Sequence, residues 1–163
     1  MKRYLSVLVL GLFLALGCGL KAISYSYEAV CAGVGTPGNY LVKISTYGKS
    51  LGKAKEKFRS HAVHAILFKG VSGSGATGTT CNGKKPVCNV SYEENRTWFD
   101  NFFASGDYLK YVSYNNGGYI SSDDRIKTAD GNYKVSTVLV ISLDALRKRM
   151  EKEGFARTLS KGF

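Results

Sequence analysis

The sequence predicts an α+β domain in which helices cover one face of a small antiparallel sheet. Residues 39–47 alternate between apolar and polar side chains, which is the two-residue period of a half-buried strand. From about Ser50 to Phe68, apolar residues recur at helical spacing and basic residues occupy the opposite side. Segments 125–128 and 133–141 flank an Ala-Asp-Gly-Asn turn, which predicts a β-hairpin. Because strands and helices do not alternate strictly, the pattern favours α+β over a parallel α/β fold.

The apolar side of the long helix is expected to pack on the second hairpin strand. A strand repeats every two residues and a helix about every 3.6, so one face of each can be apolar along its length. The side chains expected to meet are Ala54, Phe58, Ala62, Ala65 and Ile66 from the helix and Val135, Thr137, Leu139 and Ile141 from the strand.

Three shorter elements complete the predicted fold. The S-x-x-E pattern at 91–94 is a capping box that opens a short helix, and Gly106 ends it. Residues 108–114 alternate and predict another strand. Ser142 is expected to cap a C-terminal helix that stops at Gly154. The short helix is aromatic, with Trp98, Phe99, Phe102 and Phe103.

Residues 1–22 have the layout of an export signal. Lys2 and Arg3 precede an apolar run that is too short for a stable membrane span, and small residues follow it. The segment ending at Cys18 resembles a bacterial lipobox, in which the cysteine becomes lipidated, whereas cleavage after Ala22 would release a free chain. We therefore expect an exported protein of the periplasm or outer membrane, anchored by lipid at Cys18, with residues 23–163 as a single domain.

The charge of the chain favours anionic partners. The sequence has 23 Lys and Arg against 12 Asp and Glu, and removal of residues 1–22 leaves 20 against 12. Such an excess suits an acidic protein surface, lipid headgroups or an acidic glycan. Nucleic acid fits the charge but not the expected compartment, so no nucleic-acid partner is predicted.

The cysteines beyond the signal lie where disulfides persist. Cys81 and Cys88 flank a hydrophilic turn containing Gly83 and Pro86, which favours a small loop-closing bridge between them and leaves Cys31 free. Pairing of Cys31 with Cys81 is the alternative. Because C-x6-C is not zinc-finger spacing and the two histidines are distant in sequence, neither a metal nor another cofactor is expected.

Residues 70–90 form the longest segment without an expected helix or strand. They are rich in Gly, Ser, Thr and Lys and predict a long exposed loop. A G-x-G-x-x-G pattern at 73–78 matches the dinucleotide fingerprint, but Gly83 and Pro86 interrupt the helix that this site would need. His61 and His64 are one helical turn apart and are expected to pack beside the core, since no third metal ligand is placed near them.

Several segments together resemble a family of envelope domains. They are YLVKI at 40–44, AVHAILFKG at 62–70, the strand 133–141, LDAL at 143–146 and MEKEG at 150–154. These segments are similar to the small domain shared by the lipoprotein-20 family and the N-terminal domain of the flagellar assembly protein T, and to small lipoproteins of the Bacteroidetes type. The resemblance implies a helix on an antiparallel sheet with a closing C-terminal helix, and an accessory or scaffold role at the outer membrane. It implies no catalytic residues.

The expected function is therefore that of a non-enzymatic envelope protein, an interaction module whose partner is another envelope protein. A binding module for an anionic glycan or membrane surface is the alternative. A small secreted hydrolase is the third class, but no nucleophile and base can be paired from the sequence. The expected partner-binding residues are Trp98, Phe102, Arg147, Lys148 and Arg149, from the aromatic helix and the basic C-terminal segment.

Overall fold

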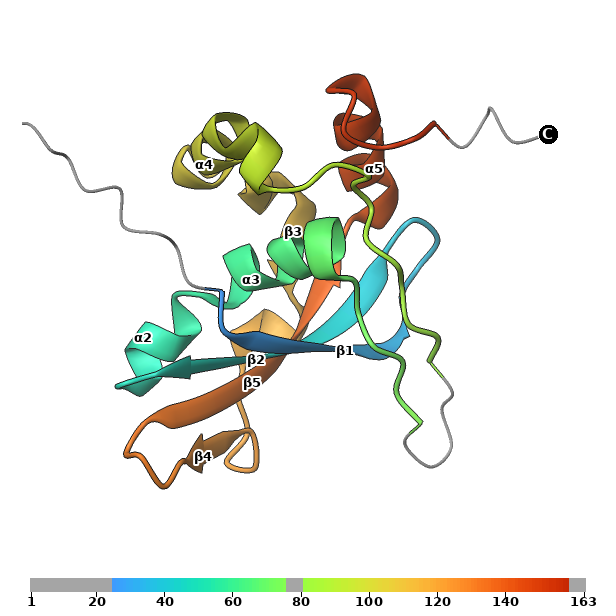
Figure 1. Cartoon of the computed structure of the whole chain (residues 1–163). Helices are drawn as coiled ribbons and strands as arrows, with labels where there is room; N and C mark the ends of the chain where they lie inside the picture. The colour runs from blue at the N-terminus through green and yellow to red at the C-terminus, as the bar shows by residue number, and fades with distance from the viewer. Residues whose placement is uncertain (1–24, 76–80, 159–163) are drawn as a thin grey trace, which may run out of the picture.

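A computed structural model describes residues 25–75 and 81–158 and shows an α+β fold (Figure 1). The helices lie on one side of a five-stranded sheet, as the sequence predicts. The export signal, including Cys18, lies outside the described residues. In the part of the chain that the structure describes, no helix is long and apolar enough to cross a membrane.

The sheet is built around two long central strands. Strand β2 (Tyr40–Gly48) pairs antiparallel with β5 (Tyr133–Ile141) along its whole length, from Tyr40 opposite Ile141 to Gly48 opposite Tyr133. The sheet order is β1-β2-β5-β3, and β4 also pairs with β5. This arrangement confirms the predicted strand at 39–47 and the predicted hairpin. The remaining strands are β1 (Tyr27–Val34), β3 (Val112–Tyr114) and β4 (Arg125–Lys127).

The predicted long helix is present but bent. It consists of α2 (Leu51–Lys55), α3 (Phe58–His64) and the π-helical segment η1 (Ala65–Lys69), with a break at 56–57. The Ser50 hydroxyl accepts a hydrogen bond from the Lys53 amide and caps the start. Gly70 ends the helix at φ 80°, where a Cβ atom would lie 2.6 Å from the Lys84 carbonyl oxygen. Only glycine suits that position.

The aromatic helix begins at the predicted capping box. The Glu94 amide donates to the Ser91 hydroxyl at 3.2 Å, and the Ser91 amide donates to the Glu94 carboxylate at 3.1 Å. These bonds open η2 (Glu93–Asn95) and α4 (Arg96–Ala104). The C-terminal helix α5 (Leu143–Lys152) is also where it was predicted, although the Ser142 side chain makes no capping hydrogen bond.

The strand predicted at 108–114 is mostly wrong. Residues Asp107–Tyr111 form the 3-10 helix η3, and only Val112–Tyr114 is a strand; η4 (Asn115–Gly118) follows it. Gly106 is in the left-handed region at φ 79° and turns the chain sharply after α4. The tight turn that follows packs Tyr108 against Phe103, with ring centroids 5.3 Å apart.

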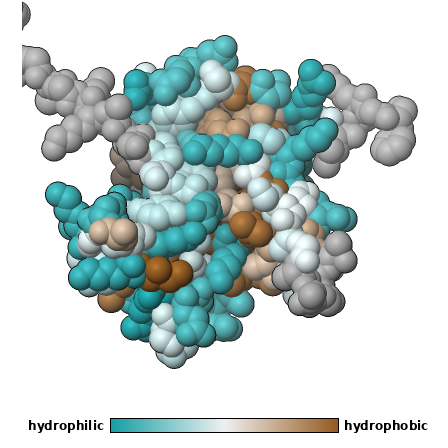
Figure 2. All heavy atoms as spheres, turned by 60° about the horizontal axis from the view of Figure 1, so that its bottom comes forward, coloured by the Kyte–Doolittle hydropathy of each residue, from teal (hydrophilic) through white to brown (hydrophobic). Residues whose placement is uncertain are grey.

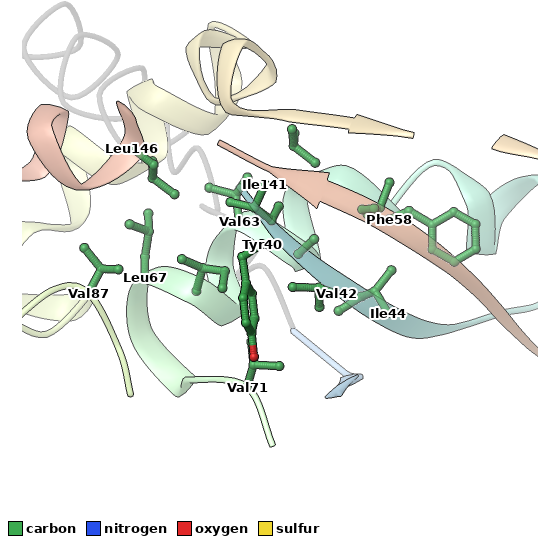
Figure 3. Close-up of a cluster of buried hydrophobic side chains, with 14 of the residues drawn as sticks. Tyr40, Val42, Ile44, Phe58, Val63, Leu67, Val71, Val87, Ile141 and Leu146 are labelled. Atoms are coloured by element: carbon green, nitrogen blue, oxygen red, sulfur yellow. The ribbon is translucent and has the colours of Figure 1, made fainter. Parts of the chain in front are cut away.

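The core lies between the bent helix and the helix-facing side of the sheet. Val135, Leu139 and Ile141 are fully buried and Thr137 nearly so, as are the five helix residues predicted to meet them. Figure 3 shows Val42 and Ile44 of β2 in one cluster with Phe58, Val63 and Leu67 of the helix. At about 25 cal/mol per Å² of apolar surface removed from water, this contact is the main source of stability of the fold.

Residues 70–90 are not the simple exposed loop that was predicted. Val71, Cys81 and Val87 are buried, and backbone bonds fix the segment to the fold at several points. The Cys31 amide donates to the Ser72 carbonyl at 2.8 Å, and the Val87 amide donates to the Ile66 carbonyl at 2.9 Å. Residues 71–74 therefore lie along the free edge of β1, and residues 87–88 lie beside the bent helix.

This course explains why the predicted Cys81–Cys88 disulfide is wrong. The structure joins Cys31 to Cys81, with Cα atoms 5.8 Å apart, and leaves Cys88 free. Cys31 points to the helix side of β1, next to the segment that carries Cys81. The Cys88 amide donates instead to the Leu67 carbonyl at 3.0 Å, which holds Cys88 against the bent helix. The alternative pairing from the sequence is the one observed.

The other face of the sheet is mainly polar. Figure 2 shows this side of the molecule as largely hydrophilic, with hydrophobic atoms toward the centre and in separate small patches. Lys134 pairs with Glu28 at 2.6 Å, Lys43 pairs with Asp124 at 2.7 Å, and the Ser45 and Ser136 hydroxyls bond at 2.8 Å. These contacts join side chains of β5 and β1, of β2 and the turn before β4, and of β2 and β5 on this face.

Candidate functional site

The structure brings together residues of α4 and α5 that the sequence singled out separately. The guanidinium of Arg149 lies 5.9 Å from the centre of the Trp98 ring, within reach of a cation–π contact. Phe155, just beyond α5, packs edge-on against Trp98 at 4.8 Å. We call the surface made by Trp98, Lys148, Arg149 and Lys152 the basic–aromatic face. Arg147, the other predicted partner-binding residue of α5, is two residues from Arg149 and lies on the opposite flank of the helix, near Cys88.

The register of α5 positions the basic residues of this face. Leu146 and Met150 are four residues apart and fully buried, so they fix the side of α5 that faces the core. Arg149 then lies beside the core and toward α4, where it also pairs with Glu153 at 3.2 Å. Lys148 and Lys152 are exposed. The face therefore combines Arg149, whose guanidinium contacts Trp98 and Glu153, with the exposed ammonium groups of Lys148 and Lys152.

Phe102 is the predicted partner-binding residue that the structure places elsewhere. Its side chain is 4% exposed and stacks beneath Trp98, with ring centroids 5.2 Å apart. It belongs to the core and offers no surface to a partner. Trp98 is half-buried and keeps an accessible edge, so the aromatic helix contributes one contact residue to the face rather than two.

A second arrangement surrounds the two histidines, which are buried as predicted, His61 at 3% and His64 at 6% exposure. Tyr25 stacks on His64 with ring centroids 3.6 Å apart, and the Tyr27 hydroxyl bonds to His64 Nδ1 at 2.7 Å. Burial, with Lys69 nearby, lowers the pKa of His64 to about 3, and burial with Lys57 and Lys69 lowers that of His61 to about 4. Both imidazoles are therefore neutral at pH 7.

A cavity of about 300 Å³ opens beside His61. We call it the His61 pocket. It lies between α3 and α4, and Tyr25, which precedes β1, and Tyr108 of η3 also line it. His61 Nδ1 is buried and has no hydrogen-bond partner. The lining residues are Tyr25, Lys57, Ser60, His61, Asp100, Phe103, Ala104 and Tyr108.

A further cavity of about 320 Å³ lies beside the disulfide, at the start of β2. Cys81, Tyr40 and Asp144 are among its lining residues. The Tyr40 hydroxyl donates to the Asn82 carbonyl at 2.8 Å, so the aromatic group facing this cavity is already paired.

Among the residues that the structure describes, neither the Ser60 hydroxyl nor the Cys88 thiol is hydrogen-bonded to a base. The Ser60 hydroxyl, next to His61 in sequence, donates to the Lys57 carbonyl at 3.1 Å. Burial raises the pKa of the Cys88 thiol to about 12, so it stays protonated at neutral pH. Within 25–75 and 81–158, no group of three His, Cys, Asp or Glu side chains could hold a metal ion.

No protein-family model, no curated protein and no solved structure matches this chain. The resemblance to envelope lipoproteins therefore remains an expectation from the sequence. Sequence reasoning also missed the role of Tyr25 and Tyr27. Their spacing of two residues was the available signal, because it places both rings on the same face of an extended segment, and in the structure both reach the histidines of α3.

Proposed function

We propose that this protein is a non-enzymatic exported domain, anchored by lipid at Cys18, that acts as an accessory interaction module in the cell envelope. In this proposal the basic–aromatic face docks on an acidic surface of an envelope protein. The observation that supports it is the contact between Arg149 and Trp98, with Lys148 and Lys152 exposed alongside.

The disulfide supports the proposed location outside the cytoplasm. A Cys31–Cys81 bridge is consistent with an oxidising location outside the cytoplasm, where such bonds persist. It also fixes the 70–90 segment to the edge of β1. The disulfide thus stabilises the same domain that carries α4 and α5, the two helices of the basic–aromatic face.

The chemistry of the face suits a protein partner. Trp and Arg are the residue types that most often dominate binding energy at interfaces. The ring of Trp98 holds the Arg149 guanidinium in place, so less side-chain freedom is lost when a carboxylate binds to it. The exposed Lys148 and Lys152 would steer an acidic surface toward the face and would contribute mainly to the rate of association.

A matched pair of charge-reversal variants tests the proposal. The variant Arg147→Glu, Lys148→Glu and Arg149→Glu alters the face, and the control Lys49→Glu, Lys55→Glu and Lys127→Glu changes the net charge equally at exposed positions elsewhere. Co-purification from the native envelope after mild crosslinking should lose a partner protein only in the first variant, with both variants folded by circular dichroism. Retention of the partner by the first variant, or its loss from both, would contradict the proposal.

An anionic glycan or membrane surface is the second candidate, and the same excess of basic residues favours it. Its signature is different. Binding to extracted envelope polymer or to vesicles of anionic lipid, without any protein partner and with a steep loss in salt, would assign the face to that class instead.

A further inference from the structure

The His61 pocket is independent of the basic–aromatic face. Both use α4, but Trp98 and Asp100 are two residues apart on that helix and therefore point to nearly opposite sides of it. The pocket also depends on α3, Tyr25 and η3, none of which contributes to the face. Its occupant need not be the envelope partner, and the inference below does not rest on the proposed function.

The unpaired His61 Nδ1 is the first observation that points to a ligand. Buried polar atoms in folded proteins almost always have a hydrogen-bond partner, and an exception calls for an explanation. His61 is neutral at pH 7, so Nδ1 can accept or donate one bond according to the tautomer. His61 is itself one of the residues that line the pocket, so its imidazole is within reach of a molecule bound there.

The walls of the pocket combine flat aromatic surfaces with hydrogen-bonding groups. Tyr25, Phe103 and Tyr108 supply the rings; Phe103 lies 6.3 Å from Tyr25 and 5.3 Å from Tyr108 between ring centroids. Ser60 and Asp100 add a hydroxyl and a carboxylate to the same lining. Sites for small molecules typically pair mostly apolar walls with a few polar groups in this way.

The charges around the pocket argue against an ionic ligand. Asp100 would repel an anion. Its carboxylate also accepts a hydrogen bond from the Tyr92 hydroxyl at 2.5 Å and lies 3.8 Å from Arg96 Nε, so these groups already offset part of its charge. Lys57, in the lining, would repel a cation. A neutral molecule is repelled by neither side chain, and one with an apolar face and several hydroxyl groups matches the aromatic and polar groups of the lining.

We propose that the His61 pocket binds one neutral sugar ring. A pyranose has an apolar C–H face that fits against an aromatic ring and hydroxyls around its rim. The volume of about 300 Å³ accommodates one such ring and little more. In this arrangement the C–H face lies on the Tyr25, Phe103 and Tyr108 walls, and rim hydroxyls bond to Ser60, Asp100 and His61 Nδ1.

An NMR titration of the isotope-labelled protein, purified after export, tests the proposal. The probes are methyl glucoside, methyl galactoside and N-acetylglucosamine, with choline and inorganic phosphate as charged comparisons. At least one sugar should shift signals of α3 and α4 saturably, with a dissociation constant in the millimolar range that is typical of weak single-ring contacts. Longer oligosaccharides carrying the same sugar distinguish a free monosaccharide from the end of a glycan by tighter binding.

Two pocket variants and one control complete the test. His61→Phe should weaken sugar binding about tenfold or more, because it removes the buried Nδ1 hydrogen-bonding group. Asp100→Asn, at a half-exposed position, should weaken it several-fold, because a neutral amide oxygen is a weaker acceptor than a carboxylate. The control Asn39→Ala alters the other cavity and should bind as the unchanged protein does. The proposal is overturned if no sugar shifts these signals, if choline or phosphate binds there instead, or if Asp100→Asn binds sugar with unchanged affinity.

Discussion

Removal of the buried Cys31–Cys81 disulfide should lower the stability of this fold by several kcal/mol. The bridge closes a loop across 50 residues of sequence. In the chain-entropy treatment, a loop of that length stabilises the folded state by about 4 kcal/mol, because the cross-link restricts the unfolded chain. The rejected Cys81–Cys88 bridge would have closed a much shorter loop, worth about 2–3 kcal/mol. The two pairings therefore predict different losses of stability when the bridge is removed.

The variants Cys81→Ser and Cys88→Ser separate the two pairings. Cys81→Ser should lower the free energy of unfolding by about 4 kcal/mol, which corresponds to roughly 10–15 °C in Tm for a domain of this size. Cys88→Ser removes a half-buried thiol and should cost about 1 kcal/mol or less. Urea titrations with and without reductant measure both values. If Cys88→Ser proves as damaging as Cys81→Ser, or if unreduced protein is alkylated at Cys31, the reasoning is wrong.

Three other predictions follow from the histidines, from Gly70 and from Cys18. The pKa values of His61 and His64 are lower in the folded protein than in the unfolded chain, so the unfolded chain binds more protons below pH 6.5. The free energy of unfolding should therefore fall by up to about 2 kcal/mol per histidine between pH 7 and pH 5. Equal urea midpoints at the two pH values would contradict this. Gly70→Ala should cost about 1–3 kcal/mol in urea titrations, because of the positive φ and the Lys84 carbonyl, whereas Gly131→Ala, at a similar φ with open space around it, should cost less. Cys18→Ser should move the protein from the detergent phase to the aqueous phase without a change in Tm; a mature N-terminus at Ile23 in both forms would reject lipidation.

The parts of the fold that the sequence predicts correctly are those with a long, regular apolar period. Strand β2, the bent helix and strand β5 each carry such a pattern, and the burial of Phe58, Ile66 and Leu139 in one core follows from it. The capping box at Ser91 and Glu94 is equally local, and both of its hydrogen bonds are present. Local chemistry was sufficient for these elements.

The errors arise where contacts outside the patterned segment itself decide the outcome. Residues 108–111 alternate like a strand, but the turn at Gly106 and the packing of Tyr108 on Phe103 favour a 3-10 helix. The partner of Cys81 depends on the course of residues 70–75 along β1, and the sequence around Cys81 contains no sign of it. The short spacing to Cys88 was therefore a misleading guide.

The candidate site was predicted in part for the same reason. The basic residues of α5 and the aromatic residues of α4 are visible in the sequence, but their contact through Arg149 and Trp98 requires the two helices to be adjacent. Burial of Phe102 likewise depends on which side of α4 faces the core. The His61 pocket could not be predicted, because Tyr25, Ser60 and Asp100 meet only in the folded chain.

Site-specific photocrosslinking in the intact envelope tests whether the basic–aromatic face binds an envelope protein. A photoreactive residue is placed at Lys148, on the basic–aromatic face, or at Lys127, an exposed position on β4. The account predicts a discrete adduct with an envelope protein from position 148, which disappears when Arg147 and Arg149 are also changed to Glu, and no such adduct from position 127. The absence of a protein adduct at position 148, or the same adduct from both positions, would contradict it.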